Sequence, residues 1–157
     1  MADVRVTTRG ARPVSPRRVE IRASGFLATL DRVSVKIDHL ALPATDAEAS
    51  ARWLAEILDL EPPRPDGPDG DMFNVSLGGG SASPLFVTDP SVAGHHVAFA
   101  VTEAQFGEIV DRLRSRDIAF GNEPENPANG ETSDPLGTKG RVYFLDPNGH
   151  FFEVTTG

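Results

Sequence analysis

The sequence predicts an α+β fold built from two β-α-β-β-β modules. Two segments carry this prediction, IDHLALPATDAEASARWLAEILDLEP from Ile37 and HHVAFAVTEAQFGEIVDRLRSRDIAF from His95. Each begins with an apolar strand that contains histidine, passes through threonine and an acidic residue, and enters an amphipathic helix. The two halves also end alike, in PLFVTD and FFEVTT. We therefore predict two copies of one unit, spanning residues 35–89 and 95–156.

The helix of each module is predicted from apolar residues that recur three and four positions apart and so form one face. The residues of the first helix are Trp53, Leu54, Ile57 and Leu58, and those of the second are Phe106, Ile109, Val110 and Leu113. These faces are expected to cover one side of each sheet, together with the large apolar residues of the strands.

The end of the second module, VYFLDPNGHFFEVTT from Val142, predicts a β-hairpin. Pro147–Gly149 suit a three-residue loop, with proline at the second turn position and a glycine that tolerates positive φ. In that register Tyr143 faces Glu153, and Phe152 lies on the opposite, apolar side. A carboxylate among packed aromatic residues needs a partner, unless it lies on the wet face of an edge strand.

Composition limits the class of protein. The chain has 157 residues, of which 39% are hydrophobic, enough for one domain with a packed core. It has no cysteine, which excludes a disulfide framework and a thiolate metal site. Its apolar runs are too short to span a bilayer and no signal-peptide pattern is present, so we expect a cytoplasmic protein without a membrane partner.

Charge is spread unevenly along the chain. Residues 1–22 contain six arginines against Asp3 and Glu20, a net charge of +4, while the other residues carry 9 basic and 21 acidic groups, a net charge of −12. We predict that residues 1–34 are a basic extension outside a single domain of residues 35–157. The extension could contact nucleic acid or an acidic partner, but it lacks interleaved aromatic residues, and a solvated arm is expected. The acidic body argues against nucleic acid as the main ligand.

Strand alternation brings three candidate metal ligands to one face of the predicted sheets. His39 and His96 occupy matched positions in the two modules, on strand faces whose other residues are mostly small. The internal symmetry places Glu153 on the same face. Two imidazoles and one carboxylate leave open positions on a bound ion and suit Fe(II) or Mn(II), with Zn(II) and Ni(II) as alternatives. Each residue alone also has a structural interpretation, as a packed histidine or a solvated glutamate.

The motifs IDHLAL, GHHVAFAV and GRVYFLDPNGHFFEV resemble the vicinal oxygen chelate superfamily, which includes glyoxalases, fosfomycin-modifying enzymes, bleomycin resistance proteins and extradiol dioxygenases. The resemblance covers residues 35–156. It implies a glyoxalase-like curved mixed sheet around a cavity, with His39, His96 and Glu153 as metal ligands. In glyoxalases the last strand of the first module supplies a further glutamate, and the matched residue here is Phe86. Because phenylalanine cannot bind a metal, the resemblance implies the three-ligand pattern of the dioxygenases, with Phe86 in the substrate site.

The resemblance also assigns Tyr143 as a catalytic residue that hydrogen-bonds a bound oxygen or transfers a proton. Arg141 is a candidate for attracting an anionic substrate, with a solvated loop charge as the alternative. Extradiol enzymes have an acid-base histidine between their first two metal ligands, and this sequence lacks it. His95 and His150 are expected to be packing or surface residues, since they point away from the predicted site.

Three classes of function follow. The first is a divalent-metal-dependent enzyme, a dioxygenase or a lyase/isomerase, acting on a small molecule that chelates the ion through two oxygens. The second is a metal-free protein that binds an antibiotic or another small molecule, favoured if the cavity is apolar and a cation of the fold engages Glu153. The third is a catalytically idle interaction domain. A homodimer is expected, and the turn-rich segment from Gly121 to Gly140 is a candidate lid.

Overall fold

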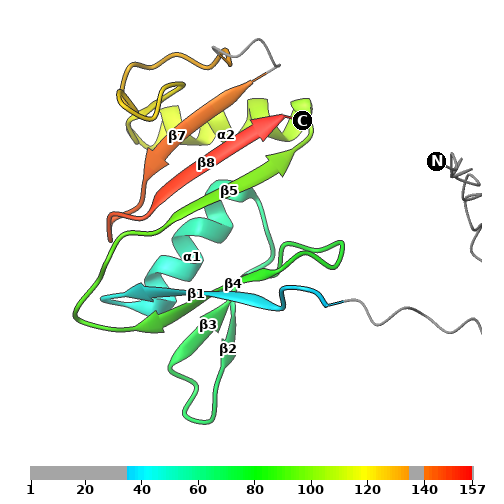
Figure 1. Ribbon diagram of the computed structural model, residues 1–157, viewed down its shortest axis with the longest axis vertical. Coiled ribbons are helices and arrows are strands. Elements are labelled where there is room, and N and C mark those ends of the chain that lie inside the picture. Colours follow the sequence, from blue (N-terminus) through cyan, green and yellow to red (C-terminus); the bar gives the residue numbers. More distant parts are fainter. Residues whose placement is uncertain (1–34, 135–139, 157) are drawn as a thin grey trace, which may run out of the picture. The chain divides into compact units, whose positions relative to one another are not determined.

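Each half of the described chain forms one helix and one four-stranded sheet (Figure 1). The computed structural model describes residues 35–134 and 140–156. The first half contains β1 (His39–Ala44), α1 (Ala47–Leu58), β2 (Arg64–Asp66), β3 (Met72–Asn74) and β4 (Ser83–Thr88). The second half contains β5 (His96–Val101), α2 (Glu103–Ser115), β6 (Phe120–Gly121), β7 (Arg141–Leu145) and β8 (Phe151–Thr156).

The two sheets have the same topology. Strand order is β1-β4-β3-β2 in the first sheet and β5-β8-β7-β6 in the second. In each sheet the first strand of the module pairs in parallel with the last strand, and the other pairs are antiparallel. The predicted α+β fold of two β-α-β-β-β modules is therefore confirmed. The predicted basic extension of residues 1–34 lies outside the described residues and stays a prediction.

Helix α1 begins and ends at residues that suit helix termini. The Asp46 side chain accepts a hydrogen bond from the backbone N–H of Ala49 at 2.9 Å, which satisfies one of the free N–H groups of the first turn. The helix stops at Asp59, which adopts the left-handed conformation with φ of 58°. Its buried face includes the residues predicted from their spacing, Leu54, Ile57 and Leu58.

Helix α2 begins with a capping box. The Thr102 side chain accepts from the backbone N–H of Gln105, and the Gln105 side chain accepts from the backbone N–H of Thr102. Its buried residues are Ile109, Val110 and Leu113, as the spacing predicts. In the part of the chain that the structure describes, neither helix has the length and apolar character needed to cross a membrane.

Trp53 connects the two modules. It lies on α1, and its ring centroid is 6.1 Å from that of Phe144 on β7 and 6.4 Å from that of Phe152 on β8. Both phenylalanines are fully buried. Helix α1 thus packs on its own sheet and also reaches the second sheet. In Figure 1 it lies between the two sheets. The modules therefore share one apolar core, since burial of these rings removes apolar area of both sheets from water.

The β7–β8 hairpin adopts the predicted register. Tyr143 lies opposite Glu153, and Leu145 lies opposite Phe151. In the turn, the Gly149 N–H donates to the Asp146 carbonyl, the Asp146 N–H donates to the His150 carbonyl, and the His150 N–H donates to the Asp146 side chain. Gly149 has φ of 81°. Because successive side chains alternate, this register directs Glu153 to the side away from the core.

The hairpin turn also binds the first module. Asn148 Oδ1 accepts from the backbone N–H of Thr45 at 3.1 Å. His150 is fully buried; its Nε2 atom donates to the Pro43 carbonyl at 2.8 Å, and its Nδ1 atom accepts from the His95 N–H at 3.1 Å. One neutral tautomer satisfies both contacts. His150, expected to be a packing or surface residue, is thus buried, and its ring also makes a polar contact of the inter-module joint beside those of Asn148.

Replacing His150 by phenylalanine is expected to lower the free energy of unfolding by about 2 kcal/mol, because the backbone groups of Pro43 and His95 lose their partner while ring volume is kept. Urea denaturation followed by circular dichroism measures this change. The matched control is His95→Phe, at an exposed histidine, which is expected to change the free energy by less than about 0.5 kcal/mol. Equal losses in the two variants would contradict a specific role of the buried ring.

Candidate functional site

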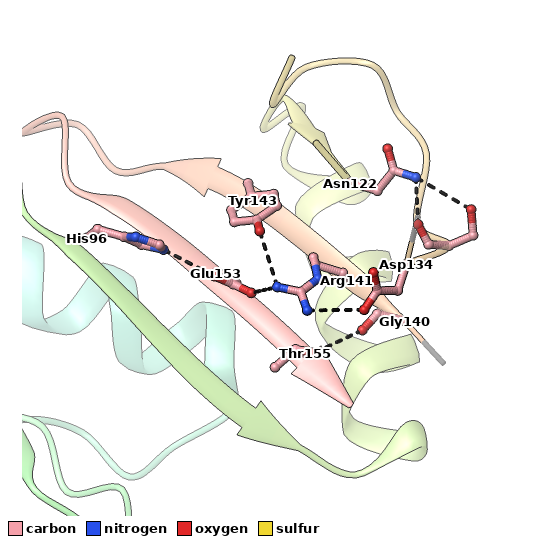
Figure 2. A network of polar contacts seen from close by, with 9 residues as sticks. His96, Asn122, Asp134, Gly140, Arg141, Tyr143, Glu153 and Thr155 are labelled. Carbon is pink, nitrogen blue, oxygen red and sulfur yellow. Dashed lines mark hydrogen bonds and ion pairs between the residues drawn. The ribbon is translucent and has the colours of Figure 1, made fainter. Parts of the chain in front are cut away.

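Glu153 lies on β8, the strand between β5 and β7, and its side chain is only 10% exposed. It is opposite Tyr143 on β7 and opposite Ala98 on β5. His96 lies two residues before Ala98, so it points to the same side of the sheet as Glu153. The His96 Nε2 and Glu153 Oε2 atoms are 3.2 Å apart (Figure 2). The structure thus brings together two of the three predicted metal ligands.

The spacing of this pair fits a single metal ion. Two donors bound at right angles, each about 2.1 Å from an ion, lie about 3 Å from each other. The observed separation of 3.2 Å is close to that value. An imidazole nitrogen and a carboxylate oxygen are also donor types that Fe, Mn, Zn and Ni ions accept. His96 and Glu153 therefore fit a shared ion without a large movement of either side chain.

Arg141, on β7, provides a cation for Glu153. Its Nη1 atom donates to Glu153 Oε1 and, at 3.2 Å, to the hydroxyl of Tyr143 (Figure 2). Its Nη2 atom donates to Asp134 at 3.1 Å. The hydrogen bonds with Tyr143 and Asp134 raise the pKa of Arg141 further above its usual value, so the group stays charged. A cation of the fold thus engages Glu153, which is the feature expected for a metal-free binding site.

The segment before β7 fixes Asp134. Asn122 donates from its side chain to the carbonyl of Ser133 at 2.6 Å, and Asn129 donates to Asn122 Oδ1 at 2.8 Å. The Asp134 side chain is fully buried. This part of the predicted lid is therefore ordered by its own side chains, while residues 135–139 lie outside the described residues.

Three rings lie beside the carboxylate. Tyr143 stacks on Phe151, with ring centroids 5.2 Å apart and planes inclined by 6°. The His96 ring lies 5.3 Å from that of Phe151 and 6.3 Å from that of Tyr143. The His96 side chain is 53% exposed. The site is therefore closed on the Arg141 side and open to solvent on the His96 side.

His39 does not join this pair within one chain. It lies on β1, in the other sheet, with 49% of its side chain exposed and its Nδ1 atom 3.0 Å from Asp38. Among the described residues, no group of three His, Cys, Asp or Glu side chains is placed to hold a metal ion. Within that part of the chain, His96 and Glu153 are the predicted ligands that the fold brings into contact.

The strand register corrects the expectation for Phe86. His39 is opposite Ser83 as His96 is opposite Phe151, so the first-module equivalent of Glu153 is Leu85. Phe86 points to the other side, where its side chain is fully buried in the core. The expected match of Phe86 with Glu153 is wrong, because parallel pairing sets the register one residue away from the one that sequence similarity suggests.

Two residues of the site have contacts that the sequence did not predict. Arg141, a candidate for attracting an anionic substrate, uses its guanidinium group to contact Asp134 and Glu153 and is 21% exposed. The hairpin register contains the signal for this contact, because Arg141 lies two residues before Tyr143 and so shares a face with Glu153. No sequence pattern points to Asp134, whose position depends on the preceding loop.

Comparisons with known proteins agree with this fold. The model of the Glyoxalase/Bleomycin resistance protein/Dioxygenase superfamily matches residues 36–154. The solved structure of Oxidase ChaP-H1 is 35% identical, with a TM-score of 0.72, and the match covers 79% of this chain and 97% of that chain. Oxidase ChaP-H2 is 33% identical, with a TM-score of 0.71 and coverage of 79% and 94%. Lactoylglutathione lyase from Agrobacterium tumefaciens is 21% identical, with a TM-score of 0.56 and coverage of 80% and 96%.

The chain therefore belongs to the glyoxalase/bleomycin resistance protein/dioxygenase superfamily, as its motifs indicate. The likeness to the lyase supports the fold alone, since its sequence identity is low. A comparison with curated proteins found no match.

Replacing Arg141 by methionine is expected to lower the free energy of unfolding by about 3 kcal/mol, because it removes the guanidinium group that contacts the buried carboxylates of Asp134 and Glu153. Urea denaturation at neutral pH measures this loss. The matched control, Arg52→Met, breaks an exposed ion pair with Glu48 and is expected to cost less than about 0.5 kcal/mol. A loss no larger than that of the control would show that the Arg141 contacts contribute little to stability.

Proposed function

We propose that this protein is a divalent-metal-dependent enzyme that uses dioxygen to oxidise a small molecule presenting two neighbouring oxygen atoms. The 3.2 Å contact between His96 Nε2 and Glu153 Oε2 carries the proposal, because it sets an imidazole and a carboxylate at the spacing of two ligands of one ion. The similarity to Oxidase ChaP-H1 supports oxidation over the lyase and isomerase chemistry found elsewhere in the superfamily. Fe(II) and Mn(II) are the preferred ions, with Zn(II) and Ni(II) as alternatives.

The side chains around Glu153 have separate roles in this proposal. A divalent ion bound there would supply a Lewis acid that stabilises negative charge on a substrate oxygen. Tyr143 accepts from Arg141, so its own hydroxyl hydrogen is directed to another oxygen, and it serves as the donor to the substrate. Phe151 and His96 border the open side, where a flat aromatic substrate can stack.

The third ligand of the proposed ion is His39 of a second copy of the chain. His39 is exposed on β1, the edge strand of its sheet, and among the described residues of one chain it joins no group of three metal-binding side chains. The same segment exposes Val35, Ile37 and Leu40, with relative exposures of 95%, 67% and 39%. Apolar residues exposed together commonly mark an interface, which supports a homodimer that covers them.

Metal content tests the proposed site. Protein purified without chelators and loaded anaerobically with Fe(II) or Mn(II) is expected to bind the ion, whereas His39→Ala, His96→Ala and Glu153→Ala each lower occupancy strongly. Binding to the folded state should also raise the melting temperature of the wild type but not of these variants. Oxygen consumption with catechol-type substrates then reports oxidation. His95→Ala is the control, and equal metal content in all variants would refute the site.

Complementation tests the shared site. A heterodimer of one His39→Ala chain and one Glu153→Ala chain keeps one complete set of ligands if His39 comes from the other copy. It is expected to bind one ion, although each parent homodimer binds none. The control heterodimer combines a His96→Ala chain with a Glu153→Ala chain. It has no complete set of ligands, whether His39 comes from the same chain or from the other one. Failure of the first heterodimer to bind an ion would contradict a site formed between copies.

A metal-free binding protein is the second candidate function. Arg141 pairs with Glu153 in the observed structure, as expected if the fold itself neutralises this carboxylate. A mainly apolar cavity of about 360 Å³ also lies beside β5, bordered by Leu40, Val97 and Phe99. Calorimetric titration of chelator-treated protein with aromatic antibiotics separates the two candidates. Tight binding without metal, together with no metal uptake by the wild type, would favour this second function.

A further inference from the structure

The two oxygens of the Glu153 carboxylate have different partners. Oε1 accepts from Arg141, whereas Oε2 faces His96 at 3.2 Å. Oε1 lies toward the closed side of the site and Oε2 toward the side that opens to solvent at His96 (Figure 2). One oxygen thus has the cationic Arg141 as its partner, and the other faces His96, the second donor of the proposed ion.

Arg141 is held from several directions at once. Its Nη2 atom donates to Asp134, whose side chain is fully buried, and its Nη1 atom also donates to the Tyr143 hydroxyl at 3.2 Å. Asp134 in turn follows the loop that the Asn122 and Asn129 side chains tie together. A planar guanidinium contacting two carboxylates has little freedom to rotate, so Arg141 is expected to keep its place when an ion binds.

We propose that Asp134 and Arg141 form a brace, here the Asp134–Arg141 brace, which makes Glu153 a metal ligand through Oε2 alone. Arg141 occupies Oε1 and so prevents the carboxylate from binding the ion through both oxygens. This inference rests on the metal site of the proposed function. Both members act on the ion through Glu153 and are therefore positioning residues.

The charge of Asp134 makes an arginine compatible with a cation site. Arg141 alone would neutralise Glu153 and repel a divalent ion nearby. Asp134 offsets the charge of Arg141 while it fixes the direction of the guanidinium. The brace can therefore orient Glu153 without removing the negative charge that attracts the ion. Supporting residues of this kind commonly set the affinity of metal sites.

The double variant Asp134→Asn/Arg141→Gln tests the brace. It removes one negative and one positive charge, so the net charge of the site is unchanged, and Glu153 keeps its contact with His96 but loses Arg141. Mn(II) affinity measured by calorimetry is expected to fall about ten-fold, because Glu153 loses its fixed orientation. Infrared difference spectra on Mn(II) binding are expected to change from the wide carboxylate splitting of one-oxygen ligation to the narrow splitting of two-oxygen ligation.

The control double variant Glu48→Gln/Arg52→Gln removes an equally neutral pair on the surface of α1 and is expected to match the wild type. Circular dichroism verifies that each variant is folded. If Asp134→Asn/Arg141→Gln fails to fold, Arg141→Lys replaces it, because a single ammonium cannot reproduce the two-nitrogen contact and the same spectral change is expected. Wild-type affinity and splitting in the folded brace variant would overturn the brace alone. Absence of Mn(II) binding by the wild type would overturn the metal site and the brace together.

Discussion

Glu153 reaches His96 only because β8 pairs in one register with both of its neighbours. On one side the register is set by parallel pairing with β5, and on the other by the hairpin with β7. A slip by one residue would direct Glu153 into the core and move the fully buried Phe152 to the outer face. Such a slip would bury a carboxylate away from its cation and expose an aromatic ring, and both changes are unfavourable. The same strand register therefore buries Phe152 in the core and places Glu153 beside His96 on the other face.

The turn of the same hairpin also sets how the modules pack. Asn148 and His150 lie in or next to the turn, and they bind Thr45 and Pro43 of the first module. Because His150 is fully buried and both ring nitrogens have partners, the turn cannot shift along β1 without breaking these contacts. A single hairpin therefore carries the candidate site on the middle of its strands and the inter-module joint at its turn. The site is built on the more constrained part of the chain, as preorganised binding residues require.

The sequence could predict features that depend on a local pattern, such as a hairpin register. It could not predict contacts between segments that are far apart in the chain. Tyr143 opposite Glu153 follows from a turn of known length and the two-residue period of a strand, and the structure confirms it. The predicted match between Phe86 and Glu153 was wrong because β4 pairs in parallel with β1. A long connection joins these two strands, so no tight turn fixes their register. Asp134 reaches Arg141 only through the loop around Asn122, for which no periodic pattern exists. His39 and His96 are matched by the repeat, but matched positions in two sheets are not thereby close in space.

The repeat is chemically asymmetric, and this asymmetry bears on how a complete site could form. Leu85 occupies the position in the first module that Glu153 occupies in the second, so the first module offers His39 without a carboxylate beside it. An exposed histidine alone is a weak ligand set, since metal sites need several donors converging on one point. The second module offers His96 and Glu153 with the closed side of the carboxylate already engaged by Arg141. The first module thus offers one histidine, and the second offers a histidine and a carboxylate. Among the described residues of one chain, no group of three such donors comes together. The proposed three-ligand site therefore calls for a second copy of the chain, whereas binding without metal does not.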